Sequence, residues 1–151
     1  MKKLFIIQLI LLFVVSNVNA QVNVKARSGY GFGTRCTFHV EDVEPNGLQL
    51  TMTLIDNLIS LPEKPTMLIK LMDDTTLELK GNRTYGKVEK WMGTDYHKDA
   101  ATFDLTQEQF KKMAEGIKKL RINTQPKPFE KEWKNGKFGK ELYKDYQKSE
   151  F

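Results

Sequence analysis

The chain has 151 residues and carries 24 Lys and Arg against 19 Asp and Glu, which gives a formal net charge of +5. Its single cysteine, Cys36, excludes an internal disulfide, but the length is sufficient for a domain with its own hydrophobic core. The sequence contains two histidines and none of the Cys-x-x-Cys, His-Glu-x-x-His or Gly-x-Ser-x-Gly motifs. No catalytic residue is therefore predicted from a motif.

The N-terminal segment has the pattern of a cleavable signal peptide. Two lysines follow the first methionine, and residues 4–15 form an apolar run that a single glutamine interrupts. Polar residues and then Ala20 follow, which is typical of a cleavage site. The run is about a dozen residues long, whereas roughly 20 are needed to span a bilayer. We therefore expect a signal peptide over residues 1–20, a single domain over residues 21–151 and a periplasmic or extracellular location.

Charge is distributed unevenly along the expected mature chain. Residues 21–110 carry ten Lys and Arg against thirteen Asp and Glu, and residues 111–151 carry twelve against six. A basic region of this kind can contact an anionic polymer of the cell envelope. The alternative is that its lysines only keep amphipathic helices soluble. Nucleic acid is not expected as a partner, because the chain is exported and the basic region holds one arginine, Arg121.

Alternating apolar and polar residues predict two hairpins in the first half of the domain. Residues 21–33 form a first strand or a loosely fixed leader. Residues 34–43 and 48–54 alternate on either side of an Asn-Gly turn signal. Residues 66–72 and 75–80 have the same alternation of apolar and polar residues on either side of an Asp-Asp pair. We expect the Gly-Asn pair after residue 80 to end this second hairpin.

The chain after this hairpin alternates less regularly. Residues 85–91 are a short strand candidate, residues 92–97 are expected to be a loop, and residues 100–105 form a strand that enters a helix. Thr106 and Gln109 match a capping box. Apolar residues then recur at helical spacing, at Phe110, Met113, Ala114 and Ile117.

The last part of the chain predicts a strand at residues 119–124, an irregular stretch at residues 130–136 and a final helix at residues 137–148. Strands joined by tight hairpins are antiparallel. The order of elements therefore predicts an α+β fold, in which a twisted antiparallel β-sheet is built from hairpins and two C-terminal helices pack on one face.

Two groups of side chains are of the types that bind metals or act as a nucleophile and its base, and each group also has a purely structural explanation. Asp95, His97 and Asp99 alternate and could share one face toward a divalent cation, but a polar loop explains them equally and no metal is predicted. Cys36 and His39 lie on opposite faces of one expected strand, so they do not form a nucleophile–base pair. His39 is expected to face solvent and Cys36 to lie in the core.

The segment Gly29–Gly33 has three glycines, but a strand pattern follows it, whereas a phosphate loop leads into a helix. No cofactor is predicted.

Aromatic and basic residues in the second half of the chain form a candidate binding surface: Trp91, Tyr96, Trp133, Lys134 and Lys137. Exposed aromatic rings can stack on sugars or anchor in a partner protein. The alternative is that these rings pack the helices onto the sheet. Trp133 is expected to be the most exposed of them, because it lies in the irregular stretch.

Three stretches, at residues 68–79, 103–109 and 139–143, resemble small exported bacterial proteins of uncharacterised function. The resemblance implies an exported bacterial domain and no mechanism. The absence of disulfides agrees with a bacterial origin, since small exported eukaryotic domains usually depend on them.

Three functional hypotheses remain. The first is a non-enzymatic binding or accessory module of the bacterial envelope, whose partner is an anionic polymer or a protein. The second is a small extracytoplasmic hydrolase without a recognisable motif. The third is a proteinaceous inhibitor of a partner enzyme, with segments Asn57–Pro65 and Gly93–Lys98 as its inserting loops. The oligomeric state is not predicted, and the empty motif search favours a non-enzyme.

Overall fold

The computed structural model describes residues 22–27, 33–43 and 47–149. The expected signal peptide, most of the glycine-rich segment and most of the first hairpin turn lie outside the described residues. The described part contains eight strands and two helices in this order: β1 (Val22–Arg27), β2 (Gly33–Val43), β3 (Gly47–Asp56), β4 (Thr66–Leu71), β5 (Thr76–Trp91), β6 (Thr94–Leu105), α2 (Gln107–Glu115), β7 (Ile117–Ile122), β8 (Phe129–Glu132) and α3 (Lys137–Ser149).

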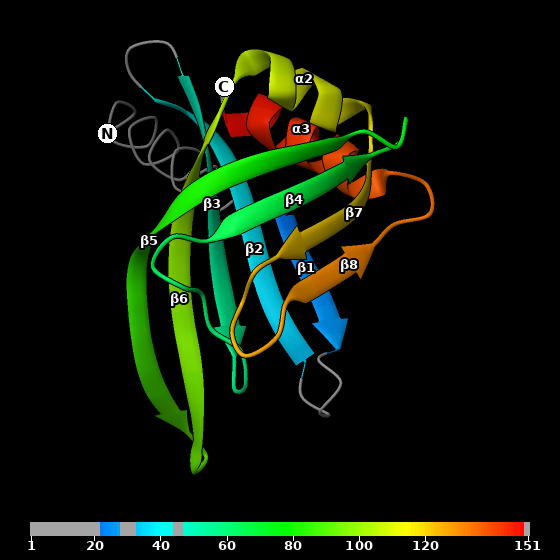
Figure 1. Ribbon diagram of the computed structural model, residues 1–151. Helices are drawn as coiled ribbons and strands as arrows, with labels where there is room; N and C mark the ends of the chain where they lie inside the picture. Colours follow the sequence, from blue (N-terminus) through cyan, green and yellow to red (C-terminus); the bar gives the residue numbers. More distant parts are fainter. Residues whose placement is uncertain (1–21, 28–32, 44–46, 150–151) are drawn as a thin grey trace, which may run out of the picture.

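The strands form one antiparallel sheet in the order β1-β2-β3-β6-β5-β4-β7-β8. The sheet curls into a half-barrel with the helices at one end (Figure 1). The predicted α+β class and antiparallel sheet are confirmed. Both predicted hairpins are also present, as β2–β3 and β4–β5. Strand β8 falls in the stretch that was expected to be irregular and pairs with β7.

Strand β5 joins the two halves of the sheet. Its residues 76–80 pair with β4, and its residues from Gly81 to Trp91 pair with β6. At this change of partner, a Cβ on Gly81 would lie 2.6 Å from ring carbons of Phe103. Only glycine allows so close an approach. The expected end of the strand at Gly81 is therefore wrong, since β5 continues past this glycine to Trp91.

Apolar side chains fill the concave side of the sheet. The alternation seen in the sequence of β3 is reproduced, with every second residue from Leu48 to Leu54 buried. The largest fully buried side chains include Phe38, Phe103, Phe138, Leu48, Leu50 and Met52. Full burial of such a side chain stabilises the fold by about 1.5–3 kcal/mol, so this core supplies the main driving force for folding.

Helix α2 begins with the predicted capping box. The Thr106 side chain accepts a hydrogen bond from the Gln109 backbone N–H at 3.1 Å, and the Gln109 side chain accepts one from the Thr106 N–H at 2.9 Å. These bonds satisfy two backbone donors at the helix start that have no partner within the helix.

Helix α3 connects the two ends of the curled sheet. The Phe138 ring meets Phe38 of β2 edge-to-face at 5.1 Å, and Tyr146 donates a hydrogen bond to Asp42 at 2.8 Å. The same helix also contacts β7, near the opposite end of the strand order. Within the described residues, neither helix is long and apolar enough to cross a membrane.

The two helices pack tightly at Gly139, and we expect Gly139→Ala to destabilise the protein. A Cβ at this position would lie 1.9 Å from the carbonyl oxygen of Met113. Alanine normally favours a helix over glycine by about 1 kcal/mol, but the overlap with backbone should give a net loss of roughly 1–3 kcal/mol. Thermal unfolding followed by circular dichroism measures the difference. Lys140→Ala, an exposed change one residue away, should stay within about 0.5 kcal/mol of the unmodified protein. A Gly139→Ala protein as stable as this control would contradict the close packing.

Candidate functional site

The outer parts of β5 and β6 form a hairpin that extends beyond the rest of the sheet (Figure 1). Its last residue pair is Trp91 with Thr94. The two residues between them have positive φ, 49° at Met92 and 79° at Gly93, as a type I′ turn requires. The loop expected at residues 92–97 is therefore wrong, because residues 94–97 already belong to β6.

The tip of this hairpin exposes large apolar side chains. Trp91 is 65 % exposed and Met92 is 85 % exposed. Tyr96 lies diagonally across from Trp91, with ring centroids 6.3 Å apart in an edge-to-face arrangement. The structure thus brings two of the predicted surface residues together. Sequence reasoning missed Met92, because Met-Gly is not one of the residue pairs that signal a two-residue hairpin and only the glycine fits that pattern.

The other three predicted surface residues lie after β8 and at the start of α3, away from the hairpin (Figure 1). Trp133 stacks on Phe138 with centroids 4.6 Å apart and packs against the core. The expectation that Trp133 is the most exposed aromatic residue is therefore wrong. Lys134 is exposed, and Lys137 forms an ion pair with Glu141 at 3.4 Å. The five predicted residues do not make one surface.

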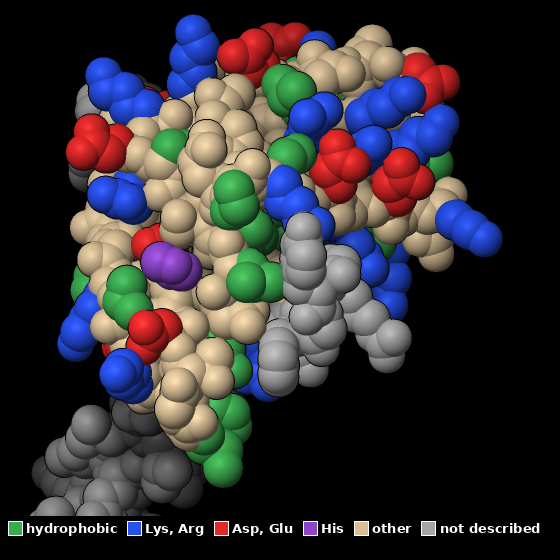
Figure 2. Space-filling view, turned by 60° about the horizontal axis from the view of Figure 1, so that its bottom comes forward, with side chains coloured by type: hydrophobic (Ala, Val, Ile, Leu, Met, Phe, Trp, Pro, Cys, Tyr) green, Lys and Arg blue, Asp and Glu red, His purple; other side chains and the backbone are tan. Residues whose placement is uncertain are grey.

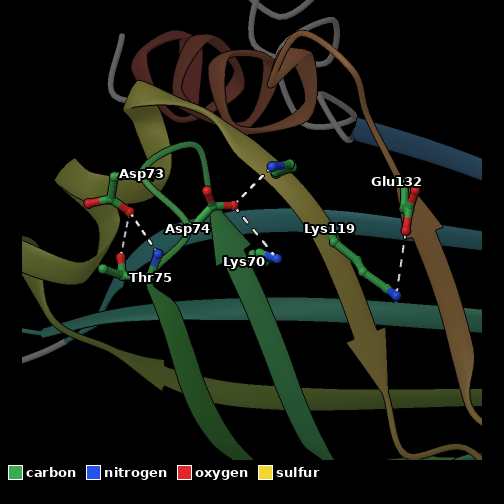
Figure 3. Close-up of polar contacts among 7 residues, drawn as sticks. Lys70, Asp73, Asp74, Thr75, Lys119 and Glu132 are labelled. Atoms are coloured by element: carbon green, nitrogen blue, oxygen red, sulfur yellow. Dashed lines mark hydrogen bonds and ion pairs between the residues drawn. The ribbon is translucent and has the colours of Figure 1, made fainter.

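Part of the basic C-terminal region is neutralised locally by acidic neighbours. Lys119 of β7 lies 3.6 Å from Glu130 and 3.5 Å from Glu132 of the adjacent strand β8, and Figure 3 shows the contact with Glu132. Lys118 lies 2.9 Å from Asp74 in the β4–β5 turn. Figure 2 shows Lys and Arg interspersed with Asp and Glu over the visible face. This arrangement supports the simpler interpretation of the lysines better than a polyanion-binding surface.

The pKa values of the two aspartates in the β4–β5 turn are lowered (Figure 3). For Asp74, the hydrogen bond from Lys118 is the largest cause, followed by the charges of Lys118 and Lys70. For Asp73, the hydrogen bonds from the side chain and backbone of Thr75 lower the pKa. Both carboxylates are fully exposed, so they stabilise the turn without marking a reactive site.

The acidic residues of the candidate metal cluster have different environments. Asp99 is buried and accepts a hydrogen bond from the backbone N–H of Leu61 at 2.9 Å. Asp95 is exposed near the hairpin tip. In the part of the chain that the structure describes, no group of three or more His, Cys, Asp or Glu is placed to hold a metal ion. Asp99 therefore serves to anchor the connection between β3 and β4.

A second buried carboxylate, Asp56, anchors the start of the same connection. Asp56 accepts hydrogen bonds from the backbone N–H groups of Leu58 and Ile59, at 2.6 and 2.9 Å, and from the Thr34 hydroxyl. Ile59 and Leu61 are buried in the core. The segment at residues 57–65 is thus held against the end of the half-barrel, whereas residues 93–98 extend from it.

Cys36 and His39 have no catalytic geometry. Burial raises the pKa of the Cys36 thiol, and the nearby charge of Asp56 raises it further. His39 is only partly exposed, contrary to the expectation that it faces solvent, because its Nδ1 lies 3.0 Å from an oxygen of Asp145 in α3. The histidine therefore helps to attach α3 to β2.

Comparison of the chain with protein-family models, with curated proteins and with solved structures found no match. The fold and site define a curled antiparallel half-barrel, braced by a C-terminal helix, that presents a protruding hairpin with an aromatic tip.

We expect the Cys36 thiol to be inert in the folded protein. Its side chain is buried and its pKa is raised, so a thiol reagent at pH 8 can reach it only after the fold opens. Labelling by a chromogenic disulfide should be roughly a hundredfold or more slower than in denaturant. Lys98→Cys, on the exposed hairpin, provides a control that should react at once. Immediate labelling of Cys36 without denaturant would show that the core is accessible.

Proposed function

We propose that this chain is an exported, non-enzymatic binding module of the bacterial envelope, and that it contacts a protein partner with the tip of the β5–β6 hairpin. The observation that carries the proposal is the exposure of Trp91 and Met92 at the tip of a two-stranded hairpin. Tryptophan is among the residues that most often anchor protein interfaces, and methionine adapts its shape to a partner surface.

The residue at the first turn position supports a binding role. Type I′ turns favour Asn-Gly, because both residues need positive φ. Methionine in this conformation costs about 1–2 kcal/mol relative to a right-handed conformation, and Met92 also exposes a large apolar surface. The turn is therefore not optimised for stability or solubility. A contact made by the Met92 side chain gives a reason for this choice.

The same hairpin favours one of the alternatives as a second candidate function. An inhibitor of a partner enzyme needs a loop that protrudes and changes little on binding. Of the two candidate segments, Gly93–Lys98 lies on the hairpin that protrudes from the sheet, whereas Asn57–Pro65 is held by buried carboxylates. No comparable observation among the described residues favours the hydrolase hypothesis.

Export itself is open to a direct measurement. When the full chain is expressed in a bacterium and its mature form is purified, we expect mass spectrometry to show an N-terminus at Gln21. Ala20→Arg, which replaces the small residue before the cleavage site, should leave the precursor uncleaved. Recovery of the unmodified chain with its first twenty residues intact would contradict the proposed location.

The hairpin contact can be tested by photo-crosslinking in cells that naturally produce the chain. A photoreactive amino acid at Met92 should yield an adduct with another protein, because this side chain is at the tip. Trp91→Ala in the same chain should lower the adduct at least tenfold, since buried aromatic anchors contribute roughly 2 kcal/mol or more to binding. The free energy of unfolding should fall by no more than about 1 kcal/mol, the usual contribution of one cross-strand aromatic pair.

Two controls give this experiment its specificity. The photoreactive group at Leu68, exposed on β4, should give little adduct. Trp133→Ala should lower the thermal stability, because Trp133 stacks on Phe138, and should leave crosslinking at residue 92 in place. Equal adduct from positions 68 and 92, or an adduct insensitive to Trp91→Ala, would refute the proposed contact.

A further inference from the structure

The outer edge of β5 lacks a strand partner over the hairpin, within the described residues. Strand β4 pairs with β5 only as far as Lys80. The next outward N–H groups, those of Gly81 and Arg83, donate to the carbonyl oxygens of Pro65 and Glu63 at 2.8 Å. Beyond Arg83, β6 is the only described strand that pairs with β5, and Figure 1 shows the far side of β5 without a neighbouring strand.

The backbone groups of Gly86, Val88 and Lys90 point toward this open edge. In a two-residue hairpin, Trp91 and Thr94 form a hydrogen-bonded pair, so every second residue before Trp91 also bonds to β6 and the residues between them face outward. The outward hydrogen bonds of Gly81 and Arg83 agree with this assignment once the bulge that follows them is taken into account. A bulge between residues 83 and 85 inserts one residue and moves the outward positions from odd to even numbers.

We infer that this edge pairs with the same edge of a second copy of the chain, antiparallel and centred on Val88. In this register, each Val88 lies opposite the other Val88, and Lys87 lies opposite Glu89 of the second copy. Tyr85 lies opposite Trp91, on the same face as the Lys–Glu pairs. The outward groups of both strands then form about six backbone hydrogen bonds.

Charge selects this register. A shift of one strand by two residues keeps the outward groups facing each other and centres the pairing on Lys87 or on Glu89. The first of these registers places two lysines opposite each other, and the second places two glutamates opposite each other. Like charges directly opposite each other destabilise a strand pair, whereas opposite charges and aromatic pairs stabilise it by about 0.2–1 kcal/mol each. The register centred on Val88 avoids both repulsions and makes each favourable pair twice.

The hairpin alone leaves charges that the second copy would satisfy. Lys87 lies directly opposite Lys98 of β6, and neither lysine forms an ion pair with the residues that the structure describes. Glu89 is also unpaired within the described residues. In the inferred pairing, Glu89 of each copy lies beside Lys87 of the other and relieves the repulsion between Lys87 and Lys98.

The length of the open edge also fits one hairpin. The edge ends on one side at the bond from Arg83 to Glu63 and on the other at the turn of Met92 and Gly93. With Val88 at the centre, the second copy's turn lies beside Thr84 and stops before it reaches the β3–β4 connection. Such an interface is small beside the roughly 1,600 Å² of a standard one, so we expect a weak, concentration-dependent dimer.

Sedimentation equilibrium of the mature protein, purified from cells that express the full chain, tests the inference. The unmodified protein should pass from monomer to dimer as its concentration rises. Lys87→Glu should raise the dissociation constant at least tenfold, and Lys87→Glu combined with Glu89→Lys should restore it to within about threefold. A protein that is monomeric up to about 1 mM, or a double exchange that fails to restore the dimer, would overturn the inference.

Two further variants test the register itself. Val88→Pro removes an outward N–H, so it should abolish the dimer and retain the circular dichroism spectrum, since proline is tolerated on an edge strand. Val88→Cys should form an intermolecular disulfide on mild oxidation, because residues in a hydrogen-bonded pair have Cα atoms about 5.5 Å apart. Lys98→Cys, away from the edge, should not. Equal disulfide formation by both cysteine variants would overturn the register.

This inference does not depend on the proposed function. It concerns the purified chain alone, whereas the proposed contact is measured as an adduct with a different protein. A photo-adduct at position 92 with the mass of two chains would report the dimer, and one with any other mass would report a partner.

Discussion

The structure depends on the point at which β5 exchanges one partner strand for another. Because β4 pairs with only the first five residues of β5, β6 is the only described strand that pairs with the rest of β5, and the ends of both strands extend past Asp56, where β3 ends. Gly81 makes this possible, since any Cβ there would overlap the Phe103 ring. The change of partner strand thus depends on a close contact between Gly81 and Phe103, and the hairpin projects because β5 and β6 extend past the ends of β3 and β4.

The open end of the half-barrel is closed by a different interaction, the anchoring of the β3–β4 connection by two buried carboxylates. Asp56 and Asp99 come from neighbouring parts of β3 and β6, and both accept backbone N–H groups of the same connection. Leaving such N–H groups without partners in the interior would cost about 1–3 kcal/mol each. These acidic residues thus have a structural role that explains their burial without catalysis.

The sequence predicted those elements whose local pattern agrees with their tertiary environment. The hairpins of β2–β3 and β4–β5 alternate cleanly because one face of each strand is buried, and the capping box of α2 is a purely local signal. The outer half of β5 escaped prediction because Gly81 resembles a strand end and the bulge after Arg83 shifts the alternation by one residue. Nearly all of that half is also exposed on both faces, so burial imposes no pattern on it.

The candidate site was predictable only in part, for a related reason. Trp91 and Tyr96 were recognised as aromatic residues that could be exposed, but their proximity follows from a turn at Met92 and Gly93 that lacks the usual asparagine. The residues next to Trp133 in the sequence are mostly polar, as they would be around an exposed side chain. The Trp133 ring nevertheless stacks on Phe138 of the following helix. An aromatic side chain in an irregular stretch is placed by tertiary contacts that sequence periodicity does not encode.

A long strand that outlasts its neighbour creates an open edge, and the charges on that edge decide what it can pair with. Charges of a single sign would repel a second copy in every register, which is a common protection of edge strands. The edge of β5 instead alternates Lys87 and Glu89 around Val88, a pattern that opposes like charges in the adjacent registers and pairs opposite charges in one. The length of β5 beyond the end of its pairing with β4 therefore produces both the aromatic tip and, beside it, an edge whose charge pattern favours one register over its neighbours. The two features belong to the same hairpin because they have the same physical origin.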